Sequence, residues 1–240
     1  MGKFIYRPTK NTKQYGSKKR NLSDIKFIVI HDTGNTNRGA GALGHLNYLN
    51  GATRYGSAHY YVDDKIIAQP IGDSRVAWSV GDTWARKNRT RSDVNNSNSI
   101  SIEMCINADS DYNAMYKNTV ELTKNLMQKY KVPLDRVVRH YDASGKPCPN
   151  HMMAGGWSKW KRFLYDIDKP IEWVIDLDKN SEFGGDKVQE VKVDDNSPSE
   201  WAKESVERLV KAGVSDGLRL KEPITREEAL VMIDRALKLK

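Results

Sequence analysis

The chain of 240 residues shows two hydrophobic periods in its first 170 positions, and each period predicts one kind of element. Residues 25–31 (IKFIVIH) are apolar and β-branched, which is typical of a buried strand, and the DTGNTNRG segment behind them has the composition of a loop. Two short strands around a tight turn are predicted for AHYYVDDKIIAQPI, and one more strand for RVVRHYD. Residues 99–105 (SISIEMC) alternate, so one face of a strand carries Ile100, Ile102 and Met104 and the other carries Ser101, Glu103 and Cys105.

Helical spacing marks three other segments. Leucines spaced three residues apart predict a short helix over residues 42–49, and a longer helix is predicted over residues 112–130, ahead of Pro133. An amphipathic helix is predicted around residues 157–164, where two tryptophans and a phenylalanine share one face. Strands that alternate with helices indicate an α/β domain over about residues 20–170. Residues 1–24 are interpreted as a polar lead-in to this domain.

The pattern changes after residue 170, and three parts are predicted: a main domain over 1–170, a polar, acidic linker over 171–197, and a small all-α unit over 198–240. Two capping boxes, Ser197 with Glu200 and Thr225 with Glu228, open the two helices of that last unit. Such a short unit cannot build a generous core alone. It is therefore expected to serve as a separate binding unit, or to dock on the main domain or on a copy of itself.

Charge and hydropathy exclude some classes of protein. The net charge is +8, yet residues 171–240 carry 12 basic and 16 acidic residues, so the positive excess lies in the first part. A basic surface of this kind is simply solvated, or it attracts a polyanion such as nucleic acid or an anionic cell wall. No apolar run approaches the roughly 18–20 residues of a membrane helix, which excludes membrane insertion. The start of the chain lacks the apolar segment of a secretory signal, and two cysteines do not make a disulfide framework, so synthesis in a reducing cytoplasm is expected.

Candidate chemistry lies at the predicted strand ends. His31 and His140 each end a strand, and Cys148 follows in RHYDASGKPCP, so three ligands could surround one tetrahedral metal and leave a fourth position for water. Spacing alone makes this a weak signal. Lys146 would place a cation beside a metal-bound anion. Glu103 lies on the polar face of a strand otherwise built to be buried, which requires either a role or a partner such as Arg139.

The blocks IVIHDTG, SAHYYVDD, AWSVGD, NSNSISIEMC and VVRHYDASGKPCP, in this order, resemble the zinc-dependent type 2 N-acetylmuramoyl-L-alanine amidases. This family shares its fold with peptidoglycan recognition proteins and phage lysozyme-type amidases, and the resemblance covers about residues 22–165. It implies a mixed central β-sheet flanked by helices. It also implies Zn²⁺ bound by His31, His140 and Cys148, with Glu103 as the base and Lys146 as the oxyanion stabiliser, in an enzyme that cuts the bond between N-acetylmuramic acid and L-alanine of bacterial peptidoglycan.

Two positions depart from the family pattern. Some members have a catalytic Tyr where this chain has Ala58, so Glu103 must activate the water, and many members read WH where this chain has Trp78 and Ser79. His59 and Trp78 are candidate substrate contacts. A buried, hydrogen-bonded role for His59 and core packing for Trp78 stay open.

The tail resembles a single S-layer-homology module, which implies binding to a secondary cell-wall polysaccharide. Together these features predict a phage-type endolysin made in the host cytoplasm without a signal peptide, which reaches the wall after the membrane opens. A bacterial autolysin and a non-catalytic peptidoglycan-binding protein on the same fold are the alternatives. Nucleic acid is not an expected partner, because the chain carries no zinc-finger, RRM or helix-turn-helix signature.

Overall fold

The computed structural model describes residues 2–82, 86–178, 207–208 and 211–212. The chain divides into two units, Met1–Gln189 and Glu190–Lys240. The described part of the second unit comprises four residues, three of which, Glu207, Arg208 and Lys211, are helical. The two capped helices predicted for residues 198–240 otherwise lie outside the described residues, and so does most of the predicted linker.

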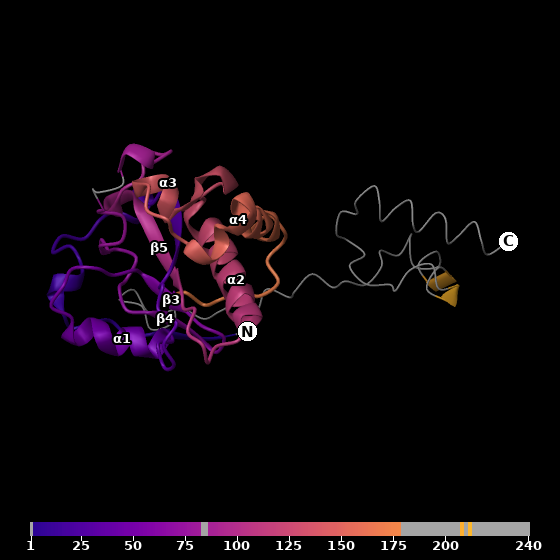
Figure 1. Cartoon of the computed structure of the whole chain (residues 1–240), viewed down its shortest axis with the longest axis horizontal. Helices are drawn as coiled ribbons and strands as arrows, with labels where there is room; N and C mark the ends of the chain where they lie inside the picture. The colour runs from indigo at the N-terminus through magenta and orange to yellow at the C-terminus, as the bar shows by residue number, and fades with distance from the viewer. Residues whose placement is uncertain (1, 83–85, 179–206, 209–210, 213–240) are drawn as a thin grey trace. The chain divides into compact units, whose positions relative to one another are not determined.

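A mixed β-sheet forms the centre of the first unit, as the sequence predicts (Figure 1). Neighbouring strands run parallel except for β3 and β4, which are antiparallel. In the described part of the chain the sheet has six strands, in the order β1 (Lys3–Tyr6), β4 (Ile66–Gln69), β3 (Tyr60–Val62), β5 (Ser99–Met104), β2 (Phe27–Asp32) and β6 (Val137–Arg139).

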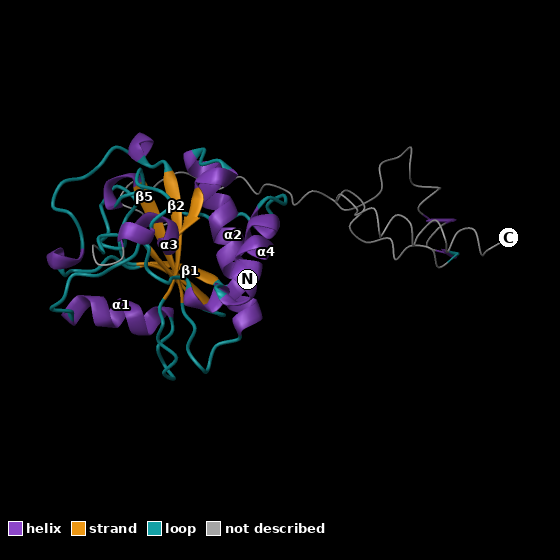
Figure 2. Cartoon of the chain, turned by 45° about the horizontal axis from the view of Figure 1, so that its top comes forward, coloured by secondary structure: helices purple, strands orange, loops and turns teal. Residues whose placement is uncertain are grey.

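Helices flank this sheet, and three of them confirm the helices predicted from sequence. The α-helices are α1 (Ala42–Gly51), α2 (Tyr112–Tyr130), α3 (His140–Ser144) and α4 (Ala154–Ile167). Short 3₁₀ turns lie at Thr12–Gln14, Leu22–Asp24, Arg86–Asn88, Asn96–Asn98, Leu134–Arg136 and Asn150–Met152. Figure 2 shows α2 and α4 together beside the strands, with α1 apart from them. No helix among the described residues is both long enough and apolar enough to cross a membrane.

The two faces of the sheet bury different side chains. Ile100, Ile102 and Met104 of β5 pack in one core with residues of α2 and α4, which include Leu122, Leu126 and Phe163. On the other face, α1 covers β3 and β4 but not β5 and β2. Its Leu46 and Leu49 pack on Tyr61 of β3 and Ala68 of β4. Glu103 lies on this second face because side chains alternate along β5. The carboxyl ends of β2 and β5 are therefore left open beside α1, and this is where a site can form.

Three segments differ from the sequence-based predictions. Residues 3–6, assigned to a polar lead-in, form edge strand β1, which pairs in parallel with β4 and is only partly buried. The RVVRHYD segment is a strand only as far as Arg139, and His140 is the first residue of α3 rather than the last of the strand. Residues 171–178, assigned to the linker, contact the main domain, where Ile175 and Leu177 join the core formed with α2 and α4.

Candidate metal centre and cleft

Two neighbouring parallel strands bring the three predicted metal ligands together. β2 ends with His31 and Asp32, and β6 leads directly into His140, so both histidines reach the same edge of the sheet. The Nδ1 atoms of His31 and His140 are 3.0 Å apart, and Cys148 Sγ is 3.9 Å from His31 Nδ1. All three side chains are buried, and their ligand atoms lie within 4.8 Å of one another.

This donor set fits a small tetrahedral cation. Zinc binds imidazole nitrogen at about 2.0–2.1 Å and thiolate sulfur at about 2.3 Å, so one ion can reach donor atoms that are mutually separated by 3–4 Å. Burial lowers the pKa of His31 well below its usual value, and the nearby His140 lowers it further. Burial also lowers the pKa of His140. Both rings are therefore held neutral, which is the form that coordinates a metal.

Asp82 contacts the metal-ligand cluster and was not identified from the sequence. Its Oδ2 lies 2.8 Å from His140 Nε2, on the side of the ring opposite the Nδ1 that faces His31. Lys146 Nζ is 4.0 Å from the same oxygen. A carboxylate on the outer nitrogen of a ligating histidine fixes the ring and its tautomer. Asp82 is the last residue of the AWSVGD block. Nothing in the local sequence indicates that this block contacts residue 140.

Glu103 lies in register between two residues that line the same face. β5 pairs with β2 and with β3, so that Glu103 has His31 as its neighbour on one side and Tyr61 on the other. Its Oε1 is 4.0 Å from His31 Nδ1. Burial, and secondarily the negative charge of Asp32, raise the pKa of Glu103 to about 8, while Lys146 acts in the opposite direction.

Arg139 does not neutralise Glu103, which was the alternative left open by the sequence. The Arg139 guanidinium instead donates to both carboxylate oxygens of Asp142, at 2.6 and 2.8 Å, and lies 4.2 Å from the centre of the Trp157 ring. One Glu103 oxygen, Oε2, is buried and has no hydrogen-bond partner among the described residues. The carboxylate is thus buried without the structural partner that a purely packing role would need.

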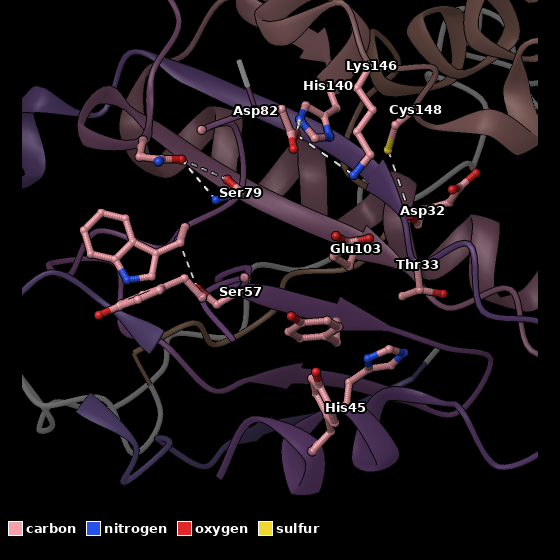
Figure 3. Close-up of a pocket in the computed structure, with 17 residues that line it drawn as sticks. Asp32, Thr33, His45, Ser57, Ser79, Asp82, Glu103, His140, Lys146 and Cys148 are labelled. Atoms are coloured by element: carbon pink, nitrogen blue, oxygen red, sulfur yellow. Dashed lines mark hydrogen bonds and ion pairs between the residues drawn. The ribbon is translucent and has the colours of Figure 1, made fainter. Parts of the chain in front are cut away.

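A cleft of about 720 Å³ opens over these groups (Figure 3). The Lys146 side chain, 44% exposed, and Glu103 both face it, together with His140 and Cys148. The remaining lining residues include Asp32, Thr33, His45, Tyr48, Tyr55, Ser57, Tyr61, Trp78, Ser79, Asp82 and Asn96. Four of the five catalytic and metal-binding residues predicted from sequence, Glu103, Lys146, His140 and Cys148, therefore line one cavity. The fifth, His31, is buried beside them.

The two candidate substrate contacts have different positions. Trp78 lines the cleft, and its indole Nε1 donates to the Lys13 carbonyl at 3.1 Å. His59 is buried away from the cleft, with Nε2 2.9 Å from the Arg20 guanidinium and Nδ1 accepting from Ser101 N at 3.1 Å. Both ring nitrogens of His59 are therefore engaged inside the protein, as in the buried, hydrogen-bonded role that the sequence left open.

Comparison with known proteins gives consistent matches over the first unit. The family model described as N-acetylmuramoyl-L-alanine amidase matches residues 21–151. The N-acetylmuramoyl-L-alanine amidase CwlH of Bacillus subtilis (strain 168) is 34% identical over 141 residues, 59% of this chain and 52% of CwlH. The chain thus spans about half the length of this relative.

Two solved structures have the same fold as the first unit. The catalytic domain of XlyA superposes with a TM-score of 0.58 at 30% identity, over 69% of this chain and 99% of that one. A structure titled as a mutant endolysin from Bacillus subtilis superposes with a TM-score of 0.57 at 32% identity, over 70% of this chain and 99% of that one. Both matches leave about 30% of the chain uncovered.

Proposed function

The chain belongs to the N-acetylmuramoyl-L-alanine amidase family, and on this premise we propose that it hydrolyses the amide bond between the lactyl group of N-acetylmuramic acid and L-alanine in bacterial peptidoglycan. One observation carries the proposal. The buried ligand set His31, His140 and Cys148 lies beside Glu103, whose Oε1 is 4.0 Å from His31 Nδ1, and His140, Cys148 and Glu103 line an open cleft.

His31, His140 and Cys148 would hold a zinc ion, since two imidazoles and one thiolate leave a fourth position open for water or substrate. A zinc ion held there would supply an acidified water and would polarise the substrate carbonyl. Asp82 would orient His140 through the contact at Nε2.

Glu103 is the residue placed to move the proton. It faces the ligand set from the neighbouring strand, and no side chain among the described residues neutralises it through an ion pair with Lys or Arg. Burial raises the pKa of Glu103, and it is the ionised form of this side chain that can accept a proton from the attacking water and return it to the nitrogen of the departing L-alanine. General acid–base transfer of this kind typically contributes about 10²–10⁴-fold to the rate.

Lys146 is placed to stabilise charge on the reacting carbonyl oxygen. Its ammonium group enters the cleft beside His140 and Cys148. The Asp82 carboxylate, 4.0 Å from Nζ, holds this group near the ligand set. A cation aimed at the position where negative charge develops lowers the barrier, because it needs little reorganisation during the reaction.

The experiment that tests this function uses purified cell wall as the substrate. We expect new free L-alanine amino termini, one zinc per chain by elemental analysis, loss of activity after dialysis against a strong chelator, and recovery with Zn²⁺. A protein that adheres to walls without releasing amino termini would instead be a non-catalytic binder on this fold. Lytic activity that survives complete metal removal would contradict the zinc mechanism.

We further propose that the enzyme is an endolysin that reaches the wall after the membrane has opened. The similarity to the structure titled as a mutant endolysin supports this setting, and a bacterial autolysin is the alternative. The resemblance of the tail to an S-layer-homology module supports a second contact, with a secondary cell-wall polysaccharide.

A further inference from the structure

His45 is a polar residue in the cleft that the mechanism does not use. It projects from α1 and stacks on Tyr61, with ring centres 5.0 Å apart and an angle of 12° between the planes. Both rings line the cleft. In Figure 3, His45 lies on the opposite side of Glu103 from His140 and Cys148.

The sheet register fixes how far this part of the cleft is from the ligand set. Tyr61, Glu103 and His31 are aligned across β3, β5 and β2. Adjacent strands lie about 4.8 Å apart, so Tyr61 and His31 are separated by roughly 10 Å. This spans about three residues of an extended peptide. His45 therefore cannot touch the bond that is cut, but it can contact the substrate group next to it.

The hydrogen-bonding state of His45 is set by its surroundings. The Ala40 backbone accepts a hydrogen bond from the ring, while burial lowers the pKa of His45 and keeps it neutral. Nε2 is buried and has no hydrogen-bond partner among the described residues. The donor to Ala40 is therefore Nδ1, which leaves a lone pair on Nε2. The stacked Tyr61 ring fixes the plane in which that lone pair lies.

We propose that His45 is a substrate-binding residue whose Nε2 accepts a hydrogen bond from a secondary-amide N–H of the muramoyl peptide. The inference rests on the proposed function, because that substrate carries such groups on both sides of the cut bond: the acetamido group of the sugar and the amides of the stem peptide. A neutral acceptor favours an N–H over the anionic groups of the wall. The cationic Lys146, which lies on the His140 side of the cleft, serves the carbonyl oxygen instead.

Two variants separate hydrogen bonding from packing. His45→Phe keeps a ring on Tyr61 but removes the acceptor, and His45→Gln places an amide oxygen near the position of Nε2. For soluble muramoyl peptide we expect His45→Phe to raise KM about 2- to 10-fold with kcat unchanged, the range of one net hydrogen bond, and His45→Gln to restore KM. Leu43→Gln, an exposed position on the same helix and outside the cleft lining, is the matched control and should change neither constant.

Binding without turnover identifies the donor. In a Glu103→Gln background, calorimetry with N-acetylmuramic acid and with an L-alanyl-D-glutamyl peptide shows which probe loses affinity when His45 is replaced by Phe. Loss with the sugar assigns the acetamido N–H, and loss with the peptide assigns the stem amide. In the Glu103→Gln protein itself, the ¹⁵N resonance of His45 Nε2 should move upfield when muramoyl peptide is added, a readout that does not depend on how the His45 variants fold.

An unchanged KM and unchanged affinities in His45→Phe, with an Nε2 resonance that does not respond to ligand, would overturn the inference while leaving the amidase function intact. A wild-type protein that releases no L-alanine amino termini would overturn the proposed function instead. The two failures are therefore distinguishable.

Discussion

At the scale of single residues, the proposed function divides the polar groups of the site into those that would bind metal and those that would act on the substrate. Glu103 and His31 face each other from adjacent strands, yet Glu103 is not within the cluster of three ligand atoms. Removing Glu103 should therefore affect proton transfer and leave metal binding in place.

Glu103→Gln keeps the shape of the side chain and removes its basicity. We expect kcat to fall about 10²–10⁴-fold, while zinc content and adhesion to walls stay at the wild-type level. Glu172→Gln, an exposed glutamate outside the cleft lining, serves as the control and should retain full activity. A Glu103→Gln protein with a near wild-type rate would show that another group activates the water.

Asp82→Asn tests the residue behind His140. The contact between Asp82 Oδ2 and His140 Nε2 at 2.8 Å should raise the basicity of the ligand and fix its orientation. We expect zinc affinity to fall about 10- to 100-fold, measured by competition with a chromogenic chelator. Asp93→Asn, which removes an exposed carboxylate paired with Arg91, should leave the affinity unchanged. Equal affinities in both variants would contradict a positioning role for Asp82.

Strand patterning made His31, His140 and Glu103 candidates, and the resemblance to the amidase family implied the ligand set and the role of Glu103. Other cleft residues were missed for a physical reason. Strand patterning is local, and parallel strands present their carboxyl ends at one edge, so residues at the ends of predicted strands are expected to meet. Asp82 and His45 acquire their positions from a loop and a helix that approach the cluster through tertiary packing. No spacing along the chain indicates that these two residues come close to the cluster. In the same way, no spacing indicates that His59 lies buried against Arg20.

At the scale of elements, the alternation of apolar and polar side chains along β5 decides which face of the sheet presents the candidate catalytic residue. The apolar side of β5 is covered by α2 and α4, so the carboxylate side is left for the cleft. This division was predictable, because a period of two is visible in seven residues. Strand β1 was not predictable, because four residues at a sheet edge, one exposed and three partly buried, show little pattern. Its partner β4 also lies about sixty residues further along the chain.

Helix α2 also holds the segment after α4 through a buried ion pair. Lys124 Nζ donates to Glu121 Oε1 at 2.7 Å and to the Pro170 carbonyl at 2.8 Å. The other Glu121 oxygen accepts from the backbone N–H groups of Glu172 and Trp173 at 2.9 and 3.0 Å. Three of these four hydrogen bonds connect α2 with residues 170–173, and the two from Glu172 and Trp173 involve residues that composition alone assigned to a linker.

Glu121→Ala should lower the free energy of unfolding by about 3–5 kcal/mol, because it leaves the Lys124 ammonium buried without its partner. The pair Glu121→Leu with Lys124→Met should lie closer to the wild type than Glu121→Ala, since neither charge is then stranded. Urea unfolding followed by near-ultraviolet circular dichroism measures both. Equal stability of Glu121→Ala and the wild type would show that the ion pair does not secure this segment.

At the scale of the whole molecule, the basic excess of the first 170 residues and the acidic balance of the remainder fit two units with different tasks. The first unit, Met1–Gln189, contains the whole cleft. The proposed wall contact of the tail then acts by raising the local concentration of the enzyme on its substrate.

A protein shortened to end after Gln189 should cleave soluble muropeptide at close to the full-length rate and should pellet less well with whole walls. A protein shortened to end after Pro170 should in addition unfold at a lower temperature, because it loses the buried side chains of Ile175 and Leu177. Pelleting assays and thermal unfolding distinguish the two effects. Equal wall adhesion with and without the tail would rule out targeting by residues 190–240.

The wide sequence separation of the metal ligands has a consequence for biosynthesis. His31 lies 109 residues from His140 and 117 from Cys148. During translation, the emerging chain therefore carries a single donor of the set until most of the main domain has been synthesised. The complete centre exists only after β6 has joined β2 and the loop with Cys148 has left the ribosomal tunnel. The nascent protein should consequently acquire its ion late and remain inert toward peptidoglycan until that moment.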